Sequence, residues 1–148
     1  GGSEEMATVE TGRAFARKWL EMFKQGEHGR LFAELLAPDL RFLSPAVHTA
    51  YTDRMTIGMI LRSIVELLQE FTYEASYVAE PAPGAKEVGV VLLFSGYVTS
   101  AEGKRLRVEG VDVFKVRADG VAKELRVMLR PLSSTLEVSR QMGARLAA

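Results

Sequence analysis

The sequence contains few of the residues on which most protein chemistries depend. Its 148 residues include no cysteine and only two histidines, and 19 lysines and arginines balance 19 aspartates and glutamates, so the formal net charge is zero. The absence of cysteine excludes disulfides, thiolate metal sites and a cysteine nucleophile. Two histidines are too few for a multi-histidine centre, and a neutral chain has no global attraction to nucleic acid. We therefore expect no metal site and no nucleic-acid partner.

Long apolar runs and targeting signals are missing too. No apolar run approaches the roughly 20 residues that a membrane helix needs. Residues 1–10 carry three glutamates and lack the basic start of a signal peptide. We expect a cytoplasmic protein with no membrane partner. Residues 1–3 look like a cloning remnant, and we assign residues 1–7 to this remnant and a disordered N-terminus. Residues 8–132 are expected to form a single domain, and residues 133–148 a C-terminal helix or tail.

The periodicity of the apolar residues changes along the chain. A helical period predicts helices over residues 8–25, 29–36 and 53–71. A tail helix over residues 133–146 opens on a capping-box pattern, Ser134 with Glu137. Short apolar runs bounded by turn signals predict strands over residues 39–43, 73–78, 88–99, 104–117 and 121–130. Helices followed by a run of hairpin-linked strands are typical of an α+β fold with an antiparallel sheet.

The two longest strands have apolar residues on both faces. In residues 88–99, Val90, Leu92 and Phe94 share one face, and Val91 and Leu93 share the other. A sheet with one face in water should alternate more cleanly between apolar and polar residues. We therefore expect both faces to be covered, and predict a homodimer through the sheet face. The alternative is that the tail helix covers the second face.

Three segments carry a resemblance to a known family. Residues 24–28 (Lys-Gln-Gly-Glu-His), 35–42 (Leu-Leu-Ala-Pro-Asp-Leu-Arg-Phe) and 111–120 (Val-Asp-Val-Phe-Lys-Val-Arg-Ala-Asp-Gly) occur in the order and spacing of that family. In these segments the chain resembles the nuclear transport factor 2-like superfamily, in particular its SnoaL-like, polyketide cyclase-like branch. The resemblance implies a cone-shaped, curved antiparallel sheet wrapped around three N-terminal helices, with an apolar pocket between them and, here, an added C-terminal helix.

The catalytic sets of the family's best-defined enzymes are incomplete in this chain. Isomerases of the family place a base carboxylate after the first strand, where this chain has Ser44 before Pro45. Epoxide hydrolases of this fold place an aspartate on the last strand, where the matching position is Val127. Serine cannot remove a carbon-bound proton near neutral pH without a base of its own. Neither activity can therefore be transferred to this chain residue by residue.

Three other residues are the catalytic candidates that the resemblance leaves. Glu109 matches the isomerase acid on the penultimate strand; its alternative is an ion pair with an arginine at the surface. His48, in the loop after Ser44, is a candidate general base, because an imidazole exchanges a proton near neutral pH; its alternative is a hydrogen bond to the backbone. Asp112 could partner His48, or it could be buried beside Arg107 or Arg126. Strict alternation places Glu109 and Asp112 on opposite faces, so both reach one pocket only if Gly110 marks a β-bulge.

A set of mostly aromatic and aliphatic side chains is expected to line the pocket. They are Trp19, Phe23, Phe42, Ser44, Tyr51, Ile60, Phe94, Val111 and Val127. The sequence thus predicts a domain that binds a small apolar molecule. As an enzyme it would be a cyclase or isomerase that transfers protons without a cofactor. The alternative function is a non-catalytic module of the same fold that binds a protein or forms a structural dimer.

Overall fold

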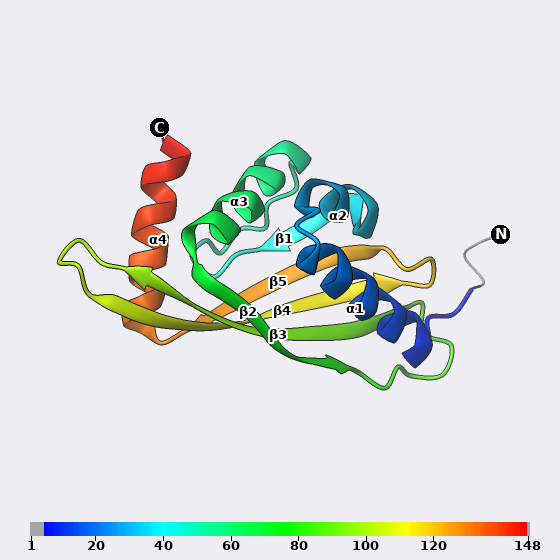
Figure 1. Ribbon diagram of the computed structural model, residues 1–148. Coiled ribbons are helices and arrows are strands. Elements are labelled where there is room, and N and C mark those ends of the chain that lie inside the picture. The colour runs from blue at the N-terminus through cyan, green and yellow to red at the C-terminus, as the bar shows by residue number, and fades with distance from the viewer. Residues whose placement is uncertain (1–4, 148) are drawn as a thin grey trace.

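A strongly curved sheet supports the helices, most of which pack against its concave side (Figure 1). The structure is a computed structural model and describes residues 5–147. The helices are α1 (Val9–Lys24), α2 (His28–Leu35), α3 (Arg54–Leu67) and α4 (Leu132–Ala147). The strands are β1 (Leu36–Leu43), β2 (Gln69–Val78), β3 (Glu87–Thr99), β4 (Arg105–Arg117) and β5 (Ala122–Arg130). No helix in residues 5–147 is long and apolar enough to cross a membrane.

The strands form one sheet in the order β1-β5-β4-β3-β2. Neighbours in this order are antiparallel except β1 and β5, which run parallel. The α+β prediction, with a curved sheet around N-terminal helices and a helix at the C-terminus, is confirmed. The expectation of a wholly antiparallel sheet is wrong at one pair, because the chain crosses over after β1 through α3 and three strands before β5 comes back beside it.

The two faces of the sheet have different environments, as β4 illustrates. Val108, Phe114 and Val116 point inward and are fully buried. Glu109, Val111 and Val113 alternate with them and point to the outer face, where each is half-buried. The β3–β4 ladder is continuous from Glu87 to Thr99, with no shift in register. Gly110 therefore marks no bulge, and the alternation predicted for this strand is strict.

Helix α1 covers the inner face because its apolar residues recur at helical spacing. Thr8 caps the helix, its hydroxyl accepting a hydrogen bond from the backbone N–H of Thr11. Phe15 and Trp19 are buried, and their rings lie 4.9 Å and 4.8 Å from the ring of Phe114 on β4. This aromatic contact fixes α1 against the centre of the sheet. Before the helix, the backbone N–H of Ala7 donates to the carbonyl of Ala85. Residues 1–3, expected to be a cloning remnant, lie outside the described residues.

Two expected helix ends are wrong. Helix α3 ends at Leu67 rather than at residue 71, because residues from Gln69 onward belong to β2 and pair with β3. Leu68 and Phe71 continue the apolar period of the helix, but Leu68 is its C-cap and Phe71 lies in β2. At the other site, Ser134 does not cap α4: its buried hydroxyl donates to the carbonyl of Arg107 at 2.6 Å and ties the helix to β4.

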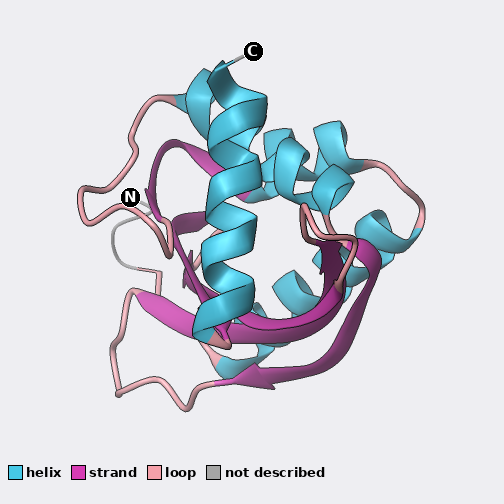
Figure 2. Cartoon of the chain, turned by 90° about the vertical axis from the view of Figure 1, so that its left-hand side faces the viewer, coloured by secondary structure: helices cyan, strands magenta, loops and turns pink. Residues whose placement is uncertain are grey.

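Helix α4 stands across one end of the curved sheet and packs beside α3 (Figure 2). Val138 on its inner side is buried against the same cluster as Phe94 and Val108. The alternative in which the tail helix covers the outer face is therefore wrong, because α4 lies on the inner side. Within residues 5–147 the outer face of the sheet has no covering element.

Candidate functional site

An inner cavity of about 230 Å³ lies between the sheet, α3, α4 and the loop that follows β1. Its walls are mostly aliphatic and aromatic side chains, among them Ile60, Ile64, Phe94, Leu129 and Met142. Helices α3 and α4 supply one side and the inner faces of β3, β4 and β5 the other. Apolar walls with a few polar groups are the usual composition of a small-molecule site.

Asp112 on β4 is the only carboxylic acid among the described residues that line this cavity. Its side chain is on the inner face because it follows the same alternation as Val108 and Phe114, and only 8% of the residue is exposed. A buried carboxyl needs a hydrogen-bond partner. Tyr73 on β2 provides one, its hydroxyl donating to Oδ2 of Asp112 at 2.9 Å.

The hydroxyl of Tyr73 is itself an acceptor. Nε1 of Trp19 on α1 donates to it at 3.0 Å, so three elements contribute to one chain of hydrogen bonds. Rings on either side hold Tyr73 in place: Phe23 and Phe71 contact it edge to face at 4.9 Å and 5.1 Å between ring centres. The orientation of the Asp112 carboxyl is thus set by side chains that lie behind the cavity.

Burial determines the electrostatics of this group. Removal from water raises the pKa of Asp112 from 3.8 to about 7, and the hydrogen bond from Tyr73 opposes part of that rise. The pKa of Tyr73 is raised, first by its own burial and then by the charge of Asp112. Near neutral pH the carboxyl is therefore divided between its acid and base forms, while Tyr73 stays protonated as a donor.

Oδ1, the second carboxyl oxygen of Asp112, has no hydrogen-bond partner among residues 5–147. The only hydrogen bond of this side chain is the one from Tyr73 to Oδ2, and the residue lines the cavity. The carboxyl is therefore held by one oxygen and available through the other. In chemical terms it can accept a proton from a bound molecule, return one, or hydrogen-bond a carbonyl or hydroxyl group.

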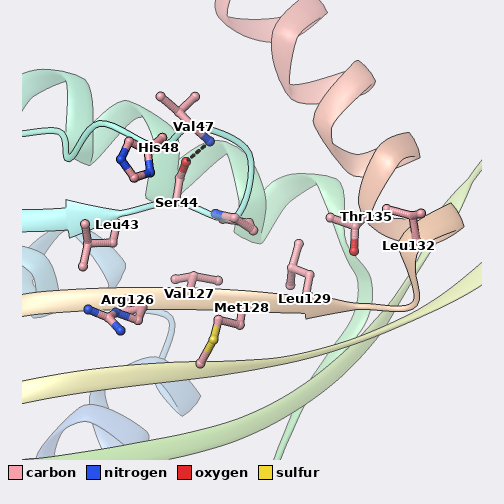
Figure 3. A pocket seen from close by; sticks show the side chains of 11 residues that line it. Leu43, Ser44, Val47, His48, Arg126, Val127, Met128, Leu129, Leu132 and Thr135 are labelled. Carbon is pink, nitrogen blue, oxygen red and sulfur yellow. Dashed lines mark hydrogen bonds between the residues drawn. The ribbon is translucent and has the colours of Figure 1, made fainter.

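A larger outer groove of about 720 Å³ lies next to the inner cavity (Figure 3). It is bounded by the loop after β1, by β5 and by the first turn of α4, represented by Ser44, Met128 and Leu132. Six residues line both spaces: Ser44, Pro45, Val47, Val127, Leu129 and Thr135. The loop keeps its shape partly through a hydrogen bond of 3.1 Å from the N–H of Val47 to the hydroxyl of Ser44. The groove and the cavity therefore lie side by side and share part of their walls.

Most of the residues expected to line the pocket do so. Phe42, Ser44, Tyr51, Ile60, Phe94 and Val127 all line the inner cavity. Trp19 and Phe23 do not line the cavity; both contact Tyr73, the residue that holds Asp112. Val111 points to the outer face of the sheet and lines neither space.

The structure does not bring the three catalytic candidates together. His48 is exposed and lines the outer groove, whereas Asp112 lines the inner cavity. Glu109 lies on the outer face of the sheet, where its carboxylate pairs with Arg130. The bulge that would have turned Glu109 inward is absent, as the continuous register shows. The alternative partners considered for Asp112 are wrong as well: Arg107 pairs with Glu74, and Tyr73 occupies the position of the partner.

The sequence prediction missed Tyr73 as a member of the site. The one available signal was that a buried indole N–H and a buried carboxyl both need partners. Tyr73 lies 54 residues from Trp19 and 39 from Asp112 along the chain. Spacing alone therefore gave no reason to join the three residues.

Comparison with solved structures finds the same architecture in several bacterial proteins. A steroid delta-isomerase from Pseudomonas aeruginosa superimposes with a TM-score of 0.76 at 27% sequence identity, over 96% of each chain. An NTF2-like protein of unknown function from Burkholderia pseudomallei K96243 has a TM-score of 0.63 at 16% identity, over 87% of this chain and 98% of its own. A putative SnoaL-like polyketide cyclase from Shewanella putrefaciens CN-32 has a TM-score of 0.56 at 14% identity, over 90% of this chain and 86% of its own. No protein-family model and no curated protein sequence matches the chain.

Proposed function

We propose that this chain, which has the fold of the nuclear transport factor 2-like superfamily, binds a small, mostly apolar molecule in the inner cavity. We further propose that Asp112 exchanges a proton with that molecule, as in an isomerase or cyclase that needs no cofactor. The observation that carries the proposal is the Asp112 carboxyl, held by Tyr73 through Oδ2 and open to an apolar cavity through Oδ1.

The chemistry follows from the environment of this carboxyl. A general base works best when its pKa lies near the operating pH, and burial raises the pKa of Asp112 to about 7. In its base form Asp112 removes a proton from a carbon next to a carbonyl group and becomes a carboxylic acid, leaving an enolate. The same carboxylic acid then returns the proton at the original or a neighbouring carbon. His48 and Glu109 take no part in this step, since neither lines the inner cavity.

The step can be tested with a simple ketone. We expect the protein to accelerate the uptake of deuterium from D₂O at the carbons beside the carbonyl of 2-tetralone. Proton NMR measures this uptake as loss of the signals of those carbons' protons. Asp112→Asn keeps the shape of the side chain and should reduce this acceleration to the rate without protein. Asp119→Asn, in the turn between β4 and β5, is the matched control and should leave the rate unchanged.

The outcomes separate the alternatives. Equal deuterium uptake with the original protein and with Asp112→Asn would overturn the catalytic proposal. If 2-tetralone binds in the inner cavity without exchange, the chain is a non-catalytic ligand-binding protein. If it does not bind, the alternative function as a protein-binding or structural module is favoured.

One observation supports the association of two copies of this chain, which we propose as well. The outer face of the sheet presents half-buried apolar side chains at its centre, Val91 and Leu93 on β3 and Val111 and Val113 on β4. Tyr77 on β2 borders them and is 58% exposed. Such a contiguous apolar patch on a chain of this size is typical of an association surface.

As the cellular location we propose the cytoplasm. The chain has no cysteine, so it gains no disulfide from an oxidising compartment.

A further inference from the structure

The inner cavity adjoins the outer groove at the place where β1 stops. β1 pairs with β5 only as far as Leu43 and Arg126. Beyond that point β5 continues to Arg130 with β4 as its only neighbour among the described strands. The outer groove follows this free edge: Figure 3 shows Val127 and Leu129 on one side of β5 and Arg126 and Met128 on the other. A ligand can therefore extend from the cavity around the edge of the strand.

The two spaces differ in size. An engineered apolar cavity of about 150 Å³ accepts benzene, so an inner cavity of about 230 Å³ has room for little more than a fused-ring system. The outer groove is three times larger, at about 720 Å³. Because six residues line both spaces, the groove is the adjoining space for the atoms of a ligand that the cavity does not hold.

The two spaces differ in charge as well. None of the described residues that line the outer groove is acidic, and Arg126 and His48 are its titratable members. The nearest carboxylate to Arg126 is that of Glu124, at 4.0 Å. Glu124 is shared with Arg41 at 3.9 Å and Lys115 at 3.6 Å, so three cations surround one carboxylate. In contrast, Arg130, four residues along the same strand, pairs closely with Glu109.

An anionic group cannot occupy the inner cavity without cost. Asp112 is the carboxyl there, and its ionised form would repel a second negative charge in an apolar environment. The edge of β5 attracts an anionic group instead, because Arg126 there is half exposed and only loosely paired with Glu124. The two ends of the site thus select for different parts of one molecule.

We propose that the ligand of this site is an organic anion, whose apolar ring system fills the inner cavity while its anionic group lies in the outer groove against Arg126. This inference rests on the proposed function, because it assigns the second half of the same ligand. Arg126 is then a specificity-determining residue that does not contact the reacting atoms. It also accounts for the break in the β1–β5 pairing, since a longer β1 would close the groove.

Two fluorescent probes that differ by one charged group test this inference. 8-Anilinonaphthalene-1-sulfonate carries a sulfonate that N-phenyl-1-naphthylamine lacks. We expect the sulfonate probe to bind the original protein about fivefold more tightly, the size of effect that one exposed ion pair gives. Arg126→Gln should remove that difference and leave the affinity of the neutral probe unchanged. Arg130→Gln removes the same charge from the same strand outside the groove and should change neither affinity.

A further variant separates failure of this inference from failure of the proposed function. Ser139 on α4 lines the inner cavity, and Ser139→Phe should abolish binding of both probes. If Ser139→Phe leaves both affinities unchanged, the probes do not use the cavity and the proposed function is contradicted. Suppose instead that Ser139→Phe abolishes binding of the neutral probe. The organic-anion inference alone is then overturned if the sulfonate probe binds no more tightly than the neutral probe, or if Arg126→Gln leaves the difference between their affinities unchanged.

Discussion

The hydroxyl of Tyr73 lies 2.9 Å from Oδ2 of Asp112 and joins two strands that are not neighbours in the sheet. β3 lies between them, so the bond crosses the concave face above that strand. The curvature of the sheet makes this contact possible, because it turns the inner faces of β2 and β4 toward each other. The same bond holds the Asp112 carboxyl in one orientation.

Replacing Asp112 should change how stability depends on pH. Burial raises the pKa of Asp112 from 3.8 to about 7, so between these values the unfolded chain has lost a proton that the folded protein retains. Stability therefore falls with rising pH across this window, by at most about 1.4 kcal/mol per pH unit from this group. Asp112→Asn cannot titrate, so its stability relative to the original protein should rise from pH 4 to 7, about the limits of that window, and then level off. Urea denaturation at several pH values measures the difference.

In the control variant, the effect on stability should change with pH in the opposite direction. The guanidinium of Arg117 lowers the pKa of Asp119, so the stability that Asp119 contributes is present at neutral pH and lost as the pH falls through its lowered pKa. Asp119→Asn should therefore cost stability at neutral pH, and that cost should vanish in acid. A flat difference between Asp112→Asn and the original protein would contradict the burial of Asp112 as an ionisable group.

Removing the Tyr73 hydroxyl should raise the pKa of Asp112 further. Tyr73→Phe deletes the hydrogen bond that favours the ionised carboxyl, and it leaves the indole N–H of Trp19 without its acceptor. We expect a loss of about 1–3 kcal/mol in the free energy of unfolding, the cost of leaving buried polar groups unpaired. Carbon-13 NMR of the Asp112 carboxyl gives its titration, and the Trp19 indole proton resonance reports the broken bond. An unchanged titration midpoint would show that the bond does not act on the carboxyl.

Glycine at position 110 is required by contacts on the inner face. A Cβ atom there would lie 2.5 Å from Cζ of Phe94 and 2.7 Å from Cδ2 of Leu129. Gly110→Ala should therefore destabilise the protein by about 1–3 kcal/mol, as overpacking of a core does. Gly58→Ala, in the middle of α3 with nothing within 4 Å of the added Cβ, should instead stabilise it by about 0.5–1 kcal/mol. Thermal unfolding of both variants tests this contrast, and equal effects would contradict it.

A charge at the centre of the outer sheet face should separate the two copies of the proposed dimer. Val111 lies at the centre of that face, opposite Leu93 and Met128 on the neighbouring strands. Val111→Glu buries a carboxylate in an apolar interface and should convert the dimer to a monomer in light scattering. Lys115→Gln, on the same face of the same strand, should leave the mass unchanged. A monomeric original protein would contradict the dimer.

The local signals in the sequence were enough for most of the elements. Thr8 before the apolar stripe of Phe15, Trp19 and Met22 fixes α1 almost to the residue. The alternation in residues 105–117 correctly places Glu109 and Asp112 on opposite faces of β4. It did not identify which face is inward, since Val111 was expected to line the pocket and points outward. The pattern failed at the start of β1, which begins three residues earlier than expected, and at the start of β2. At β2, Phe71 continues the helical period of α3, but the pairing of Gln69 with Tyr97, 28 residues away, decides between helix and strand. Pairing over that distance has no local signature.

The amino-acid composition limits which side chains can do chemistry in this protein. It contains no cysteine and two histidines, and neither histidine lines the cavity, so the site depends on one aspartate placed by alternation on the inner face of β4. The groups that surround this aspartate come from distant parts of the chain, and the fold brings them together. A register irregularity in β2 between Tyr73 and Ala75 sets Tyr73 on the inner face, and sheet curvature then carries its hydroxyl to Asp112. Such long-range geometry arises from how the strands pair and bend, and it explains why the carboxyl has a tyrosine, rather than an arginine, as its partner.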